Sequence, residues 1–176
     1  FFGNSTSGLI GCLDADGDGR PAEYDAFPNE ISQWNDTDSD GYGDNPAGLL
    51  PDHCPDEFGT SWQNSTLGCL DSDSDGWANL QDDFENDSTQ WVDSDDDGYG
   101  DNIGCNMADS CPNEFGNSTG GGVYGCVDTD GDQWADIQDQ MPNDATQYLD
   151  TDGDGYGDNP DGTNPDACPL TIGNST

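Results

Sequence analysis

The sequence predicts a mostly irregular, metal-cored, linear tandem-repeat rod that is stapled by disulfides and has little regular secondary structure. Three observations support this fold class: extreme acidity with few apolar residues, a repeat of cysteines and aromatics, and aspartate-rich loops in every repeat. The 176-residue chain has 39 acidic residues, one basic residue and a formal net charge of -38. Leu, Ile, Val and Phe make up only about 13% of it, too little to offset the entropy lost on ordering. Such a chain folds only if metals or disulfides hold it.

The same charge excludes some partners. Nucleic acid and anionic membrane surfaces would repel a chain with this net charge. The sequence also lacks a run of about 18 apolar residues, the length that a membrane-spanning helix needs. We therefore expect no nucleic-acid partner and no membrane span in this segment.

Cysteine and aromatic positions define the repeat. Cys12, Cys69 and Cys126 recur every 57 residues. The same spacing relates a second cysteine set and two aromatic sets, which are Cys54, Cys111 and Cys168, then Trp34, Trp91 and Tyr148, then Tyr42, Tyr99 and Tyr156. A fixed period of this length is typical of repeat architectures, in which each unit contacts its neighbours. We divide the chain into repeat 1 (1–57), repeat 2 (58–114), repeat 3 (115–171) and the start of a fourth repeat (172–176).

Regular secondary structure has little support in the sequence. Apolar residues at helical spacing run from Trp77 to Phe84 in repeat 2, and from Trp134 to Met141 in repeat 3, where Pro142 ends the pattern. These runs predict at most two helical turns, and alternation typical of strands is absent. The rest of each repeat predicts irregular backbone.

Each repeat contains two loops with aspartate at positions 1, 3 and 5 and glycine usually at position 6. An aspartate at position 12 completes the first loop of each repeat, and one at position 9 completes the second. The first loops supply Asp14, Asp16, Asp18 and Asp25, then Asp71, Asp73, Asp75 and Asp82, then Asp128, Asp130, Asp132, Asp136 and Asp139. The second loops supply Asp36, Asp38, Asp40 and Asp44, then Asp93, Asp95, Asp97 and Asp101, then Asp150, Asp152, Asp154 and Asp158. In the first loop of repeat 3, Gln133 replaces the glycine.

This pattern favours Ca²⁺ as the metal. Three carboxylates at alternate positions converge when the chain turns sharply, and a glycine at position 6 permits that turn. Ca²⁺ takes six to eight oxygen ligands in flexible geometry, whereas Mg²⁺ demands a tight octahedron, and an all-oxygen ligand set disfavours Zn²⁺ and Cu²⁺. We expect about six or more calcium ions, and we expect metal binding and folding to be one event. The alternative is a solvated acidic tract, which six loops in register disfavour.

The loops resemble thrombospondin type-3 repeats, with some similarity to EF-hand and dockerin loops. The short motif of that family resembles the segment from Pro28 to Asp44, its longer motif resembles Asp128 to Asp139, and its Cys-Pro junction resembles Cys168-Pro169. The resemblance implies a calcium-cored, disulfide-linked chain with little regular secondary structure. This chain departs from the family at Asn45, Asn102 and Asn159, where the family often has cysteine, and at Phe27, Phe84 and Met141, which replace the cysteine of a Cys-Pro pair.

Seven cysteines at recurring spacing suit an oxidising, extracellular or cell-surface location. Two pairing schemes fit the period. The preferred scheme joins neighbours across a repeat junction, as Cys54–Cys69 and Cys111–Cys126, and leaves Cys12 and Cys168 to pair with partners outside this segment. The other closes each repeat on itself, as Cys12–Cys54, Cys69–Cys111 and Cys126–Cys168. Cys105 has no counterpart in the other repeats.

Acceptor sequons for N-linked glycans occur at Asn4, Asn35, Asn64, Asn86, Asn117 and Asn174. We expect N-glycosylation on the outside of the chain, with a merely polar spacer as the alternative.

No catalytic constellation is present in the sequence, and we expect no enzyme. The chain has no lysine, a single histidine, His53, and carboxylates whose spacing suits ion ligation better than acid–base chemistry. The favoured function is a calcium-stabilised extracellular stalk or a filament that grows head to tail. A calcium-dependent adhesin or carbohydrate-binding module is the alternative, and a calcium buffer is a third possibility.

Overall fold

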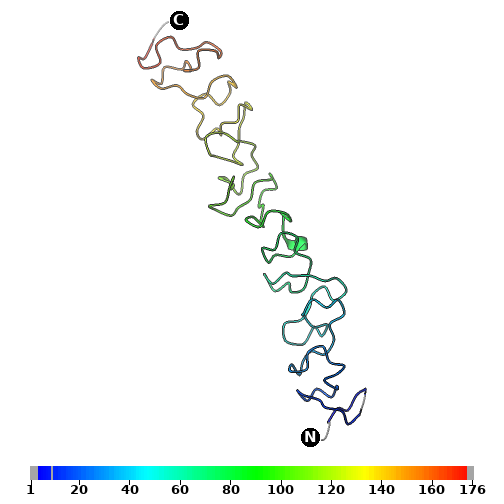
Figure 1. Cartoon of the computed structure of the whole chain (residues 1–176). Coiled ribbons are helices and arrows are strands. Elements are labelled where there is room, and N and C mark those ends of the chain that lie inside the picture. The colour runs from blue at the N-terminus through cyan, green and yellow to red at the C-terminus, as the bar shows by residue number, and fades with distance from the viewer. Residues whose placement is uncertain (1–3, 9, 174–176) are drawn as a thin grey trace. The chain divides into compact units, whose positions relative to one another are not determined.

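The structure is a computed structural model that describes residues 4–8 and 10–173. Almost all of this backbone consists of loops, bends and turns (Figure 1). The one helical element among the described residues is η1 (Asn79–Gln81), a single 3-10 turn in which the Gln81 amide donates to the Ala78 carbonyl at 2.7 Å. Two isolated β-bridges pair Gly43 with Pro51 and Asp109 with Tyr124. The expectation of a mostly irregular chain with short helical turns at most is confirmed.

Of the two apolar runs at helical spacing, one contains a helical turn. The apolar run in repeat 2 contains η1, but the run that ends at Pro142 in repeat 3 contains turns and bends instead. Nothing in the described part of the chain forms a helix of the length and apolarity that a bilayer crossing requires.

The chain divides into two compact units, Phe1–Ser88 and Thr89–Thr176. Each unit contains three aspartate loops and one disulfide. The limits of these units differ from the repeat boundaries expected from the sequence, which stay a prediction.

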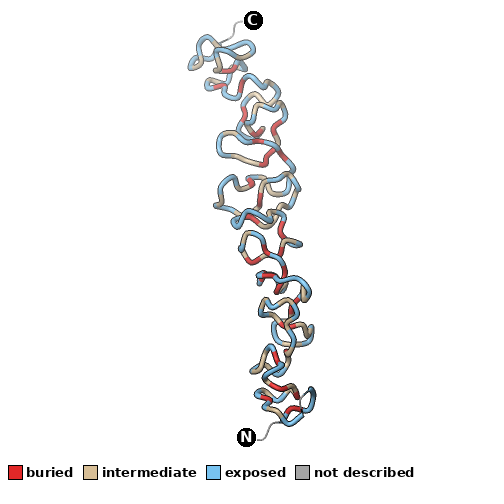
Figure 2. The backbone as a smooth tube through the Cα atoms, turned by 45° about the vertical axis from the view of Figure 1, so that its right-hand side comes forward, coloured by how far each residue is buried: buried red, intermediate tan, exposed pale blue. Residues whose placement is uncertain are grey.

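The buried side chains are mostly polar. The buried apolar residues among those described are Pro21, Cys69, Ala78, Cys126 and Ala135, whereas large apolar side chains such as Leu80 and Ile137 lie exposed. The buried polar positions are Ser5, Ser61 and Ser118, then Gln33, Gln90 and Gln147, then Asp14, Asp25, Asp52, Asp71, Asp82, Asp109, Asp128, Asp139 and Asp150. Buried positions are scattered along the tube in short stretches within each unit (Figure 2). Apolar burial therefore cannot be the main source of stability.

A buried glutamine braces the segment after each second loop. The Gln33 side chain donates to the carbonyls of Asn45 and Leu49, both at 3.1 Å, and accepts from the Asn45 amide at 3.0 Å. A Cβ at Gly43 would lie 2.2 Å from Cδ of Gln33, so only glycine fits there. The same arrangement recurs around Gln90 and Gln147. These braces hold the second loop against the segment that leads to the next repeat.

Candidate calcium sites

The first aspartate loop shows how the backbone arranges its carboxylates. The Asp14 carboxylate accepts the amides of Gly17 at 2.7 Å and Gly19 at 3.0 Å, one on each oxygen. Asp16 accepts the amide of Asp18, and Asp18 accepts the amide of Arg20. In both Asp16 and Asp18 these bonds use Oδ1 and leave Oδ2 without a hydrogen-bond partner. The turn thus points one free oxygen from each of two carboxylates inward.

The remaining five loops repeat this arrangement. In each of them the carboxylate at position 1 accepts the amide at position 6, and the carboxylate at position 5 accepts the amide at position 7. The backbone at position 6 has positive φ every time, at Gly19, Gly41, Gly76, Gly98, Gln133 and Gly155. Gln133 adopts φ 85° there, a conformation that costs a residue with a Cβ more than it costs glycine.

The aspartates at positions 1, 3 and 5 converge. One carboxylate oxygen from each member of a triplet lies within 4.8 Å of the other two. Triplets of this kind are Asp14, Asp16 and Asp18, then Asp36, Asp38 and Asp40, then Asp71, Asp73 and Asp75, then Asp93, Asp95 and Asp97, then Asp128, Asp130 and Asp132. The loop at Asp150, Asp152 and Asp154 has the same hydrogen bonds. The triplets can therefore hold metal ions.

One further aspartate, which we call the closing aspartate, lies beside each triplet. In the second loops this is a residue that the sequence pattern did not predict. Asp52 is 6% exposed, accepts the Cys54 amide on Oδ1 at 2.8 Å and leaves Oδ2 without a partner. Asp109 and Asp166 make the corresponding bonds to the amides of Cys111 and Cys168. In the first loops the predicted Asp25, Asp82 and Asp139 take this role and accept the amides of Phe27, Phe84 and Met141.

A sequence signal for these residues exists. Each closing aspartate lies two residues before Cys, Phe or Met, and proline follows that residue in five of the six cases, at Pro28, Pro55, Pro112, Pro142 and Pro169. The closing aspartate of the second loops is thus at position 17 rather than position 9 or 12.

The aspartates at position 9, whose role as metal ligands stays a prediction, make hydrogen bonds within their own loops. Both oxygens of Asp44 accept hydrogen bonds from Thr37, from the amide at 3.0 Å and from the hydroxyl at 2.6 Å. Asp101, Asp136 and Asp158 bond the residue at position 2 of their loops in the same way. The first loops of repeats 1 and 2 have Ala22 and Asn79 at this position. The aspartate at position 9 therefore holds position 2 of its own loop in place, and two of the six loops lack an acid there.

The residues present fit an oxygen-loving cation. The buried side-chain atoms without a hydrogen-bond partner, in the part of the chain that is described, are all aspartate oxygens of these loops: those of Asp16, Asp18, Asp38, Asp52, Asp73, Asp75, Asp95, Asp109, Asp130, Asp139, Asp152 and Asp166. Burying so many charged oxygens without partners is costly, because each loses its hydration. A cation among them removes that cost. Carboxylate oxygens in flexible loops suit Ca²⁺.

The pKa values report the same crowding. Burial raises the pKa of Asp52, and the charges of Asp40, Asp38 and Asp44 raise it further, whereas the hydrogen bond from the Cys54 amide lowers it. Burial likewise raises the pKa of Asp109 and Asp139, with neighbouring loop aspartates adding to the rise. These three closing carboxylates therefore lie close enough to their triplets for the charges to interact, as a shared ion site requires.

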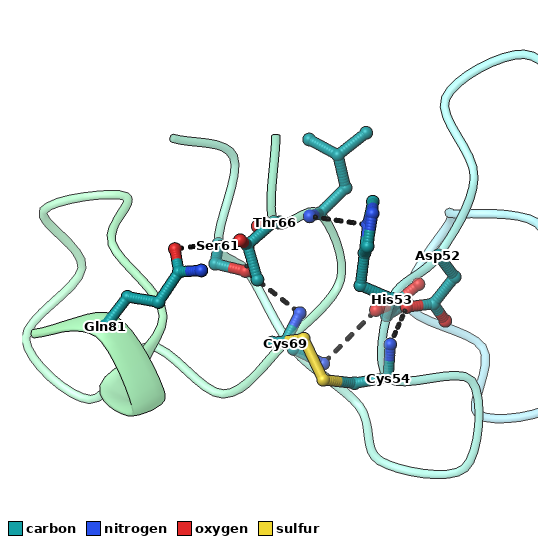
Figure 3. The surroundings of a disulfide bond; sticks show 10 residues. Asp52, His53, Cys54, Ser61, Thr66, Cys69 and Gln81 are labelled. Carbon is teal, nitrogen blue, oxygen red and sulfur yellow. Dashed lines mark hydrogen bonds between the residues drawn. A yellow bond between two sulfur atoms is a disulfide. The ribbon is translucent and has the colours of Figure 1, made fainter. Parts of the chain in front are cut away.

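Two disulfides lie beside the second loops. Cys54 bonds Cys69 and Cys111 bonds Cys126, so the structure contains both bonds of the preferred pairing scheme. Asp52, the closing aspartate of the loop that starts at Asp36, lies directly beside the Cys54–Cys69 bond (Figure 3). On the other side Ser61 accepts the Cys69 amide at 2.9 Å. The remaining cysteines, Cys12, Cys105 and Cys168, form no disulfide.

The described sequon asparagines are exposed, at Asn4, Asn35, Asn64, Asn86 and Asn117, while Asn174 lies outside the described residues. Their surroundings differ. Asn4 and Asn117 each precede a buried serine that accepts a cysteine amide. In repeat 2 that serine is Ser61, which follows Thr60, so Asn64 occupies a different place from the other two.

No protein-family model matches this sequence, and no curated protein is significantly similar to it. The resemblance to thrombospondin type-3 repeats therefore rests on the loop motifs and the Cys-Pro junction. The acidic triplets are compatible with a calcium-binding repeat.

Proposed function

We propose that this chain is a structural, extracellular repeat protein that calcium holds in shape and that assembles head to tail into a stalk or filament. The observation that carries the proposal is the set of buried aspartate oxygens without partners in the described residues, whose negative charge bound cations would neutralise. Six calcium ions would leave 26 of the 38 net negative charges. The remaining charge favours an extended, soluble chain over a compact one.

The distribution of side chains supports a structural function. The buried side chains in the described part of the chain are mostly polar, whereas ligand pockets are usually lined by apolar side chains. The rings of Trp134 and Tyr148 stack on each other at 4.4 Å, and Arg20 covers the ring of Trp34 at 4.9 Å. These aromatic rings therefore pack against other side chains of the protein, which is why we favour a structural protein over a carbohydrate-binding module.

Location and modification are part of the same proposal. Disulfides persist in oxidising compartments, which supports secretion or display on a cell surface. Exposed sequons in such a compartment can accept N-linked glycans. Intact mass measurement of the natural material tests the glycans, since the bare polypeptide mass would contradict them.

Electron microscopy of the purified chain tests the assembly. With calcium we expect uniform thin filaments, which a chelator disperses and fresh calcium restores. Asp52→Asn should weaken filaments at low calcium, whereas the matched charge change Asp56→Asn, at an exposed residue outside the loops, should not. A calcium-loaded chain that stays monomeric at every concentration would contradict head-to-tail assembly. Retention of such a monomer on glycan surfaces would favour the adhesin instead.

A further inference from the structure

Cys168 and Cys12 form no disulfide, and each lies in one half of a structure that the chain forms twice elsewhere, at its two disulfides. We call this structure the junction. In this junction the leading half contains a closing aspartate and a cysteine, and the trailing half contains a buried serine, a glycine and a cysteine. In the first junction these are Asp52 and Cys54, then Ser61, Gly68 and Cys69. In the second they are Asp109, Cys111, Ser118, Gly125 and Cys126.

Cys168 lies in a complete leading half. Its amide donates to Asp166 at 2.7 Å, and the Asp166 amide donates to the Gly157 carbonyl at 2.9 Å. The Gly173 amide, at the start of the fourth repeat, donates to Oδ2 of Asp154 at 2.7 Å, as Gly116 does to Asp97. The corresponding bonds around Cys111 are 2.7, 2.8 and 3.1 Å long. Cys168 is exposed and forms no disulfide.

Cys12 lies in a complete trailing half. Its amide donates to the Ser5 hydroxyl at 3.0 Å, and the Gly11 amide donates to the Ser5 carbonyl at 3.2 Å. The corresponding bonds in the first junction are 2.9 and 3.1 Å long. Cys12 is half-buried, whereas Cys69 and Cys126 are 2% and 1% exposed. The fold around Cys12 is therefore prepared for a disulfide.

The glycine before the cysteine of each trailing half shows which contact is missing around Cys12. A Cβ on Gly68 would lie 2.3 Å from an oxygen of Asp52 and 2.8 Å from an oxygen of Asp40, and Gly125 lies against Asp109 and Asp97 in the same way. Gly11 also has a positive φ, but no described atom lies within 4 Å of its Cβ position. In the two built junctions, Asp52 and Asp109 of a leading half cover this surface.

We propose that the leading half at Cys168 of one copy docks on the trailing half at Cys12 of a second copy, and that the two cysteines form an intermolecular disulfide. Asp154 and Asp166 of the first copy then cover Gly11 of the second. This inference rests on the proposed head-to-tail assembly and names its covalent contact. Cys105 belongs to neither half, because its thiol donates to the Thr89 carbonyl at 3.0 Å.

The bond forms by thiol–disulfide exchange with a small-molecule disulfide such as oxidised glutathione. The Cys168 thiolate attacks that disulfide and releases one glutathione thiolate, which leaves a mixed disulfide on Cys168. The Cys12 thiolate of the second copy then attacks the Cys168 sulfur and releases the second glutathione thiolate. Two protein thiols lose two protons and two electrons, and one oxidised glutathione becomes two reduced molecules.

The test incubates the full chain with calcium in a glutathione redox buffer and analyses it on a non-reducing gel. We expect a ladder of oligomers from the unaltered chain and from the control Cys105→Ser, and no ladder from Cys12→Ser or Cys168→Ser. An equimolar mixture of Cys12→Ser and Cys168→Ser should give a dimer joined by one disulfide, because each variant retains the cysteine that the other lacks. Loss of the ladder in Cys105→Ser would overturn the proposal.

Peptide mapping with isotope mixing distinguishes links between copies from links within one. An Asp-directed protease releases Cys12 in residues 1–13 and Cys168 in residues 166–176. We expect a linked pair of these peptides, after removal of any glycan, with light and heavy copies mixed when ¹⁴N and ¹⁵N chains are combined. Only unmixed pairs, or free alkylated Cys12 and Cys168, would contradict it. Filaments that form without this bond would refute the disulfide and leave the proposed function standing.

Discussion

The backbone amide of Gly59 donates a hydrogen bond to Oδ2 of Asp40 at 3.2 Å. This bond joins the second aspartate loop of repeat 1 to the first residues of the next repeat. Gly116 makes the same bond to Asp97, and Gly173 makes it to Asp154. In the first loops the equivalent oxygens of Asp18 and Asp75 have no partner. The second loops thus connect ion binding to the junction, where the disulfide also lies.

This connection predicts how the junction responds to calcium. With calcium bound, the Gly59 amide should exchange slowly with solvent, because Asp40 is held in place. Asp40→Ala, or removal of calcium, should speed its exchange together with that of Gly41 and Tyr42. Amide hydrogen exchange read residue by residue checks this. Asp56→Ala is the control, and unchanged Gly59 protection in Asp40→Ala would argue against the connection.

Asp52 should be a stronger determinant of calcium affinity than Asp44. Asp52→Asn removes the buried closing charge of the Asp36 loop and should weaken that one site by at least about tenfold to a hundredfold. Calorimetric titration should show one weakened site and five unchanged ones. Asp44→Asn keeps an oxygen to accept from Thr37 and should cost less. Equal losses in the two variants would show that position 9 is also a direct ligand.

Gln133 carries backbone strain that glycine would relieve. Gln133→Gly should stabilise the calcium-loaded chain by about 1 kcal/mol, because φ 85° disfavours any residue with a Cβ. The reverse change Gly155→Gln is a matched test, since φ there is 92° and no described atom crowds the Cβ position. It should destabilise the chain by a similar amount. Thermal unfolding with calcium measures both, and a destabilised Gln133→Gly chain or a stabilised Gly155→Gln chain would contradict the strain argument.

Acid should have opposite effects on the ion-free and the calcium-loaded chain. Without ions, burial raises the pKa of Asp52, Asp109 and Asp139 above 3.8, so the ordered form prefers them protonated. That preference stabilises the ion-free ordered form below about pH 3.8 and is lost as pH rises through the raised values. Bound calcium instead requires ionised carboxylates and should leave as pH falls through the same window.

Circular dichroism and hydrodynamic radius, followed from pH 7 to pH 3 with and without chelator, check this prediction. We expect the chelated chain to contract as pH falls and the loaded chain to release calcium. A chelated chain that expands steadily in acid would contradict it.

The sequence was enough to predict the irregular backbone and the six triplets. Alternating aspartates and a glycine turn are local features, and local backbone geometry brings Asp14, Asp16 and Asp18 together whatever the rest of the chain does. The closing residue is harder to predict, because it returns from outside the loop. The separation from position 1 to the closing aspartate is 11 residues for Asp25 and 16 for Asp52, and no helical or strand period fixes it.

The glutamine brace was not predicted for a related reason. Gln33 reaches Leu49 across 16 residues of irregular chain, and a polar side chain in an acidic sequence gives no sign that it will be buried. Gly43, Gly100 and Gly157 were the available signal, since each is a glycine outside the position 6 turn that only a close side-chain approach explains.

The most direct test of the account removes calcium while both disulfides stay intact. Near-ultraviolet circular dichroism of the tryptophans, recorded with the hydrodynamic radius, should show loss of the ordered signal and expansion on chelation, and full recovery when calcium returns. An unchanged spectrum and radius after exhaustive removal of metal would show that cations do not hold this chain in shape.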